Sequence, residues 1–163
     1  MLELDDGDLH YRNMRRLGGI WLAKSDRELA QIEGGLGPTG SMFHGRSFDA
    51  LLAKRRGSIK ATLMDQRFAA GLGNLTADES LWQARIDPRR AVSSLDEGER
   101  DVLYRKIQKV LRDSLPYGLV PSKRTWLTGA RGRRDATCPR CGTGLRRLKI
   151  GGRTTVFCPE EQI

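Results

Sequence analysis

The sequence has little of several features that define common protein classes. It contains three cysteines in 163 residues, and three thiols cannot all pair, which disfavours a disulfide framework. Only 6% of the residues are aromatic, and no apolar run approaches the roughly 18 residues that span a bilayer. The acidic start does not resemble a signal peptide. We therefore expect a cytoplasmic protein without a membrane segment, whose cysteines bind a metal or remain free.

Positive charge is abundant and unevenly placed. The formal net charge is +9, but residues 1–40 carry −2 and residues 41–163 carry +11. A basic region of this kind is typical of nucleic-acid binding, with an affinity that falls steeply as salt is added. The alternative is a basic protein whose charged faces are only solvated. The lysines and arginines cluster at 54–56, 89–90, 123–124, 131–134 and 146–149.

A glycine-containing turn within residues 63–79 is the most informative stretch. Two apolar segments with helical character flank Gly71 and Gly73, and Asn74 is placed to act as the N-cap of the second helix. The backbone amides of such a turn and of a helix N-terminus form an anion site that suits a phosphate. The alternative is a helix-turn-helix that serves only packing.

The remaining chain predicts short strands, a linker and a small bundle of four helices. Residues 34–47 are rich in Gly, Pro, Ser and Thr and read as the linker. Strands are predicted at 9–11 and 17–22. Basic residues 119–137 have no clear periodicity, and we expect them to be disordered until DNA binds. The first predicted helix spans 48–54 with Ser47 as its N-cap, and the second begins after Ser58, its N-cap. The third spans 75–86 with Trp82 in the core. The fourth runs from a capping box at 94–97 to about residue 115.

The last 26 residues predict a metal-binding hairpin. Cys138 and Cys141 have the spacing of a zinc knuckle, and a hairpin with a two-glycine turn at 151–152 follows and leads directly to Cys158. The alternative is a hairpin held by its apolar face, with three free thiols. Catalytic zinc is not expected, because no histidine or carboxylate base lies at a suitable spacing; His10 and His44 are isolated.

Three short runs together carry a family resemblance: Met64-Asp65-Gln66, Gly71-Leu72-Gly73-Asn74 and Ala77-Asp78-Glu79. They resemble the helix–two-turn–helix of the formamidopyrimidine-DNA glycosylase / endonuclease VIII family of base-excision repair enzymes. The resemblance implies an α+β fold and a damaged or abasic double-stranded DNA partner. It divides the chain into a β-sandwich remnant at 1–33, the linker at 34–47, the helix–two-turn–helix domain at 48–118, a basic connector at 119–137 and a zinc-finger hairpin at 138–163.

The resemblance also implies site residues. Asn74 and Lys60 match residues that hold phosphates beside the lesion, and Arg153 matches an arginine directed from the hairpin to DNA. Arg15 matches an arginine that helps to fill the gap left by an everted base. Leu17 replaces the phenylalanine of that loop, so a wedge is retained and aromatic stacking is lost. The alternative for these last two residues is an ordinary basic loop.

The family's zinc hairpin ordinarily ends Cys-Pro-x-Cys-Gln, whereas this chain ends Cys158-Pro159-Glu160-Glu161-Gln162. Glu161 thus occupies the slot of the fourth cysteine. The resemblance implies Zn²⁺ bound by Cys138, Cys141 and Cys158, with Glu161 or water completing the shell.

The family's chemistry begins with an amino-terminal proline that attacks the sugar, and a glutamate beside it moves protons. This chain starts Met1-Leu2-Glu3, so no catalytic residue is assigned, and we expect a monomeric DNA-binding module without glycosylase or lyase turnover. Two alternatives remain open. The chain could be a lyase that uses another amine, such as Lys60 or the free amino-terminus, or the carboxy-terminal part of a longer enzyme.

Overall fold

The computed structural model describes residues 2–11, 19–40 and 44–163, and the chain divides into two units, residues 1–34 and 35–163. In the first unit, β1 (Leu2–Leu4) pairs antiparallel with β2 (Gly7–Leu9). Helix α1 (Asp26–Ile32) follows, and the Ser25 side chain accepts a hydrogen bond from the Glu28 amide at its start.

The strand prediction for this unit is wrong. The strands lie at 2–4 and 7–9, and residues 19–22 form no strand; residues 17 and 18 lie outside the described part. The physical reason is the turn at Asp5-Asp6-Gly7. An Asp-Gly pair favours a tight hairpin, and Gly7 has a φ of +133°, which other residues rarely adopt.

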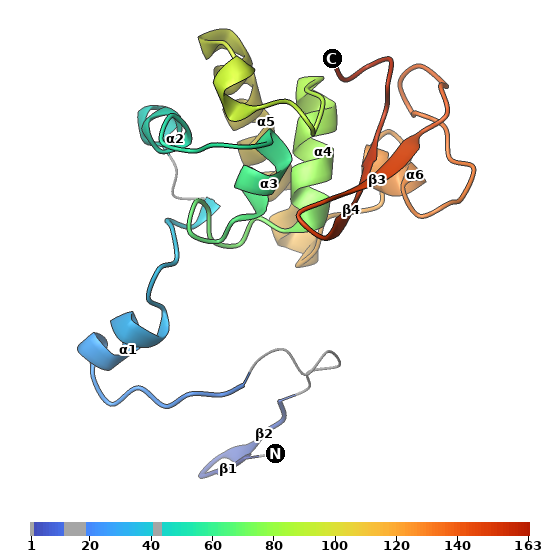
Figure 1. Ribbon diagram of the computed structural model, residues 1–163. Coiled ribbons are helices and arrows are strands. Elements are labelled where there is room, and N and C mark those ends of the chain that lie inside the picture. The colour runs from blue at the N-terminus through green and yellow to red at the C-terminus, as the bar shows by residue number, and fades with distance from the viewer. Residues whose placement is uncertain (1, 12–18, 41–43) are drawn as a thin grey trace. The chain divides into compact units, whose positions relative to one another are not determined.

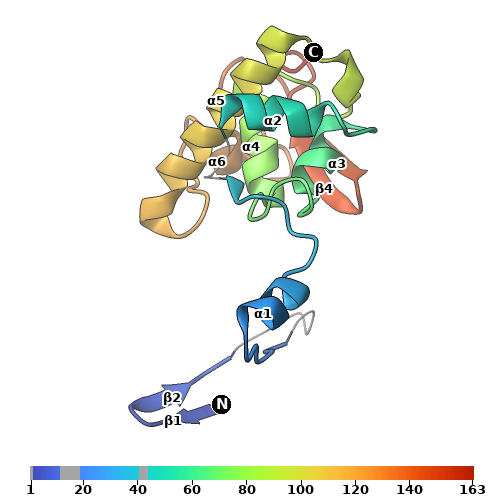
Figure 2. The same cartoon turned by 90° about the vertical axis from the view of Figure 1, so that its left-hand side faces the viewer.

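The second unit contains the predicted bundle and hairpin. Helix α4 lies among the other elements and contacts α3, α5, α6 and strand β4 (Figure 1). Helix α2 packs on α5, as Figure 2 shows from the side. The helices are α2 (Gly45–Leu52), α3 (Ile59–Met64), α4 (Asn74–Ala84), α5 (Glu97–Ser114) and the short α6 (Leu127–Ala130), with 3₁₀ turns at Val92–Ser94 and Leu115–Tyr117.

One apolar core holds the bundle together, and a second, smaller one lies under the hairpin. The first joins all four predicted helices. The second joins Trp82 to Leu127, Val156 and two cysteines, which confirms that Trp82 is a core residue. The buried residues of the first core include Phe48, Leu52, Ile59, Leu63, Phe68, Leu72, Leu81, Leu103 and Ile107.

The helix ends agree only partly with the predicted caps. The Ser58 hydroxyl accepts the Ala61 amide, as predicted. The capping box of α5 pairs Asp96 with Glu99 and therefore lies two residues beyond the predicted start. Helix α2 begins at Gly45 rather than after Ser47. No helix formed by the described residues is long and apolar enough to cross a membrane.

The expected disorder of residues 119–137 is also wrong. Trp126 and Leu127 are buried, and α6 packs against α4. The hairpin follows the predicted register: β3 (Arg146–Ile150) pairs antiparallel with β4 (Arg153–Phe157). Both turn glycines have positive φ, +55° at Gly151 and +72° at Gly152, which is why two glycines are needed there.

Candidate nucleic-acid interface and metal centre

The turn between α3 and α4 is braced by one side chain. The Gln66 amide group accepts a hydrogen bond from the Gly71 amide at 2.9 Å and donates one to the Leu72 carbonyl at 3.0 Å. Gly71 has a φ of +84°, so the turn depends on a glycine there. The Gly71 amide is therefore already used inside the protein, and the predicted anion cradle is left with Gly73 and the first turn of α4.

Asn74 does not act as the N-cap that the sequence predicts. It is the first residue of α4, and Gly73 occupies the N-cap position without a capping side chain. The Asn74 side-chain amide instead donates to the Thr154 carbonyl on β4 at 2.9 Å. This contact across 80 residues replaces the local cap, because the hairpin brings a carbonyl acceptor within reach.

Lys60 is buried instead of facing the turn. Its Nζ lies 2.5 Å from Asp78 Oδ1 and donates to Thr155 Oγ1 at 2.7 Å and to the Thr154 carbonyl at 3.3 Å. Both charged side chains are fully excluded from solvent. Burial lowers the pKa of Lys60, while the Asp78 charge and hydrogen bond oppose that shift. Three protein oxygens surround the ammonium group, and the structure does not place this side chain where a surface phosphate would lie.

Asp78 and Arg131 complete this buried network; from the sequence, Asp78 belongs to the family motif and Arg131 to a basic cluster, and neither is predicted to be part of a buried ion pair. Asp78 Oδ2 accepts hydrogen bonds from Arg131 Nε at 2.9 Å and from the Val156 amide at 3.2 Å. Arg131 Nη2 also donates to the Thr154 carbonyl oxygen at 2.7 Å. This oxygen therefore accepts hydrogen bonds from the side chains of Arg131, Asn74 and Lys60. The network fixes α3, α4 and β4 together. The sequence signal for it was Asp78 within the Ala77-Asp78-Glu79 run of the family motif; the burial of that run is a finding of the structure.

Glu79 is a second buried carboxylate on α4. Its oxygens accept from the Thr128 amide and from the Gln83 side chain, both at 2.9 Å. Burial raises its pKa, and these hydrogen bonds oppose the shift. Glu79 therefore anchors the connector, through Thr128, to the central helix.

The structure brings Asn74 and Arg153 to one place. Arg153 is exposed at the first position of β4, and the carbonyl of its neighbour Thr154 is the acceptor of Asn74. The hairpin tip is also close to the end of α3, because a Cβ added to Gly151 would lie 3.5 Å from the Met64 methyl carbon. Arg15 and Leu17 lie outside the described residues.

Three thiols form a metal-binding group at the base of the hairpin. The Sγ atoms of Cys138, Cys141 and Cys158 all lie within 4.8 Å of one another. Gly142, with a φ of +78°, donates its amide to the Cys138 carbonyl and closes the knuckle. The Trp82 indole N–H donates to Cys138 Sγ at 3.4 Å. Thiolates at this spacing suit Zn²⁺, whose tetrahedral sites favour sulfur ligands.

The two environments around these thiols differ. Burial raises the pKa of Cys158 to about 12, whereas hydrogen bonding with Thr143 lowers the pKa of the exposed Cys141. A bound metal ion would offset the cost of ionising the buried Cys158 thiol, because a coordinating thiol is deprotonated and its proton is released.

Glu161, which the sequence offers together with water as the fourth ligand, lies outside the group of three thiols. Its Oε2 is 3.0 Å from Arg140 Nη1 and 3.5 Å from Arg85 Nη2. The reason is charge, because the guanidinium groups of Arg140 and Arg85 both attract this carboxylate. The next residue, Gln162, is held as well, because its side chain accepts the Cys158 amide and donates to the Ile86 carbonyl.

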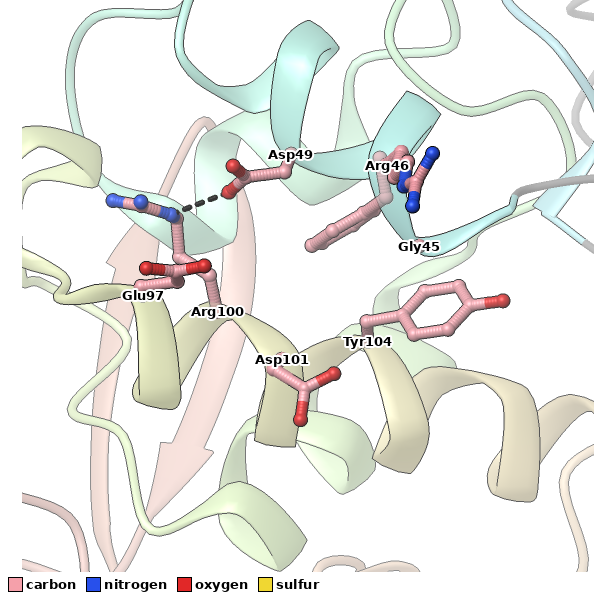
Figure 3. Close-up of a pocket in the computed structure, with 8 residues that line it drawn as sticks. Gly45, Arg46, Asp49, Glu97, Arg100, Asp101 and Tyr104 are labelled. Atoms are coloured by element: carbon pink, nitrogen blue, oxygen red, sulfur yellow. Dashed lines mark hydrogen bonds and ion pairs between the residues drawn. The ribbon is translucent and has the colours of Figure 1, made fainter.

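A separate hollow lies between α2 and the first half of α5 (Figure 3). The Asp49 carboxylate pairs with Arg100 Nε across it at 2.5 Å, and Arg46, Asp101 and Tyr104 also line it. Asn74, Lys60 and Arg153, the described side chains predicted to contact DNA, do not line this hollow. Its ion pair links the two helices that form its walls.

Two family models match the parts of the chain that carry the α3–α4 turn and the three thiols. Residues 35–123 match the formamidopyrimidine-DNA glycosylase H2TH domain, and residues 137–160 match the zinc finger found in FPG and IleRS. A formamidopyrimidine-DNA glycosylase of Pelotomaculum thermopropionicum is 34% identical over 93% of this chain and 60% of that protein. One from Heliobacterium modesticaldum is 38% identical over 98% of this chain and 63% of that protein.

Solved structures of formamidopyrimidine-DNA glycosylases also resemble this chain. The Lactococcus lactis Fpg in complex with DNA containing an abasic site superimposes with a TM-score of 0.71 and 30% identity, over 85% of this chain and 56% of that one. The Thermus thermophilus MutM (Fpg) protein gives a TM-score of 0.71 and 34% identity, over 84% and 57%. The chain thus spans about three-fifths of the length of the curated relatives it matches. With its helix–two-turn–helix domain and its zinc finger both matched, the chain belongs to the formamidopyrimidine-DNA glycosylase family of DNA repair proteins.

Proposed function

We propose that residues 35–163 bind double-stranded DNA, damaged or abasic, through the α3–α4 turn and the tip of the β3–β4 hairpin. The observation that carries this proposal is the adjacency of Asn74 and Arg153 around the Thr154 peptide group. One is an amide at the start of a helix, where the dipole favours anions, and the other is an exposed guanidinium. The named complex of the Lactococcus lactis relative with abasic-site DNA supports the choice of ligand. We also propose that it acts as a monomer in the cytoplasm; its bacterial relatives and a DNA partner support that location.

The connector and hairpin supply further positive charge to this region. Arg146 and Lys149 are exposed on β3. Arg147 Nη2 donates to the Arg131 and Arg133 carbonyls, so it also fixes the connector against the strand. Each phosphate neutralised by such a cation releases counterions, and the affinity should fall in proportion as salt rises.

Asn74 can leave its internal partner at little cost. The Thr154 carbonyl retains hydrogen bonds from Lys60 and Arg131 when Asn74 turns away. The side-chain amide can then donate to a phosphate without leaving a buried acceptor unpaired. We propose this exchange as the step that couples the turn to DNA.

We further propose that this unit binds without cutting. A lyase needs an accessible, unprotonated amine that attacks C1′ of the sugar. Lys60, the lysine at the family's phosphate-binding position, is fully buried and donates to three protein oxygens. It cannot reach a sugar while α3, α4 and β4 remain packed.

Binding is tested by fluorescence anisotropy with duplex DNA that carries an abasic-site analogue, at several salt concentrations. Arg153→Ala should lower the slope of log affinity against log salt by about one. Asn74→Ala should weaken binding to all sequences. Arg105→Ala is the matched control, because Arg105 is exposed on α5 and pairs with Asp101 four residues away. Parental binding by both site variants would refute the site.

Cleavage is tested by borohydride trapping on DNA that contains a natural abasic site. Retention of the DNA at low salt without a covalent adduct is the expected result. A trapped adduct would overturn the binding-only part of the proposal and leave the interface intact. Loss of that adduct in Lys60→Met would identify the amine.

A further inference from the structure

The metal centre has three thiols where a closed structural zinc site has four protein ligands. We propose that Glu161 does not ligate the zinc, and that the fourth coordination position stays open to an external ligand, a small-molecule thiolate. Three protein ligands and one exchangeable position are typical of open zinc sites. The proposal does not depend on DNA binding.

The first step of the argument is that Glu161 is held elsewhere. Its carboxylate is bound by Arg140 and Arg85. The Arg140 guanidinium also lies over the Trp82 ring, 4.2 Å from its centre, and donates to the Trp82 carbonyl. Moving the carboxylate to the metal would break the one ion pair that Arg140 makes among the described residues. The loss of the ion pair between Arg140 and Glu161 therefore disfavours binding of the Glu161 carboxylate to the metal.

The second step is that the backbone around Glu161 is fixed. The Gln162 side chain bonds the Cys158 amide and the Ile86 carbonyl, and both contacts are buried. The Ile163 amide also donates to the Arg85 carbonyl. The segment that follows the third thiol is therefore tied to the end of α4, and this fixed backbone carries the Glu161 carboxylate to Arg85 and Arg140.

The third step is access. Cys138 and Cys158 are buried, whereas Cys141 is exposed, so the thiol group opens to solvent on the side of Cys141. Within the described part of the chain, no histidine, aspartate or glutamate offers a ligand atom to this group. A fourth ligand must therefore come from solution.

The fourth step is the chemical class. Zinc bound to soft thiolates accepts another sulfur ligand readily. Zinc with three thiolates carries a net charge of −1, whereas Arg85, Arg140 and Glu161 form a cluster with a net charge of +1, and Arg140 lies over Trp82, whose indole contacts Cys138, so an anionic ligand meets little net repulsion. Bond formation requires only that the incoming thiol loses its proton to solvent and displaces water from the metal.

The experiment uses the whole chain loaded with Co²⁺, whose visible absorption reports the ligands. Addition of 2-mercaptoethanol should shift the ligand-field bands and raise the thiolate-to-cobalt charge-transfer absorption by roughly a third, one sulfur added to three. Ethylene glycol at the same concentration should have no effect. Loss of the cobalt bands, or no response to the thiol, would overturn the proposal.

Two variants separate the alternatives. Glu161→Cys supplies the fourth thiolate, and it should show the thiol-saturated spectrum without any additive and should not respond to the thiol. Glu161→Gln should retain both the parental spectrum and the thiol response. If Glu161→Gln alone changes the ligand-field bands, Glu161 is a ligand and the proposal fails. A response to imidazole but not to thiol would refute the thiolate class.

Discussion

The buried pair of Lys60 and Asp78 gives the sharpest prediction, with Asp78→Asn as the perturbation. In the parent, the carboxylate accepts from Lys60 Nζ at 2.5 Å, Arg131 Nε at 2.9 Å and the Val156 amide at 3.2 Å. The neutral amide keeps the shape and removes the charge. Lys60 is then left as a buried ammonium with only the neutral oxygens of residues 154 and 155 as acceptors.

The expected magnitude follows from that geometry. Removing one partner of a buried ion pair costs about 3–5 kcal/mol, because the remaining charge stays desolvated. In a chain of this size the melting temperature should fall on the order of 10 °C. Lys60→Met should cost less, since Asp78 keeps Arg131, whose side chain is partly exposed. The double variant should be more stable than the sum of the two single losses predicts.

Urea unfolding followed by circular dichroism measures these free energies. Asp113→Asn is the control, because it breaks an ion pair with Lys109 that is partly exposed, and it should cost about 0–1 kcal/mol. A loss below about 1 kcal/mol for Asp78→Asn would refute the assignment of a desolvated pair.

The pH dependence gives a second check with a definite sign. Burial lowers the pKa of Lys60, and Asp78 opposes that shift, so Asp78→Asn lowers the pKa further. Between that lowered value and the ordinary 10.5, the unfolded variant binds more protons than the folded one. Its stability should therefore rise with pH across this window. A variant whose stability is flat in alkaline solution would contradict a lowered pKa of the buried Lys60.

Three other predictions concern the connector, the central helix and the metal. Gly129→Ala would place a methyl group 2.1 Å from the Lys123 carbonyl oxygen and should cost at least 1–3 kcal/mol by urea unfolding, whereas Gly132→Ala, with nothing within 4 Å, should be neutral. The pKa of Glu79 is raised above 4.5 in the folded protein. The stability that Glu79 contributes is therefore complete below pH 4.5 and is lost as the pH rises through the folded pKa. Over that pH range the stability of Glu79→Gln, in the same assay, should rise relative to that of the parent. Chelation of zinc should lower the melting temperature in calorimetry, and zinc at 100 times its Kd should add about 2.7 kcal/mol, so an unchanged melting temperature would exclude a bound structural metal.

Local chemistry explains which features could be predicted from the sequence. The Gly151-Gly152 turn, the spacing of Cys138 and Cys141 and the cap by Ser58 depend on residues that are neighbours in the chain, and the structure confirms them. The bundle was predictable because its apolar residues recur at helical spacing.

The predictions that failed concern residues whose best partner is distant. Asn74 finds an acceptor 80 residues away instead of capping its own helix, and Lys60 finds a buried carboxylate on the next helix instead of solvent. The fold also brings two arginines beside Glu161, for which the sequence had left water as the alternative fourth ligand. By itself, the sequence determined the helices of the bundle, the carboxy-terminal hairpin, the family and the three thiols of the metal centre. Only the tertiary structure decided which charged groups are buried, because desolvation and pairing depend on what packs against a side chain and not on its place in the chain.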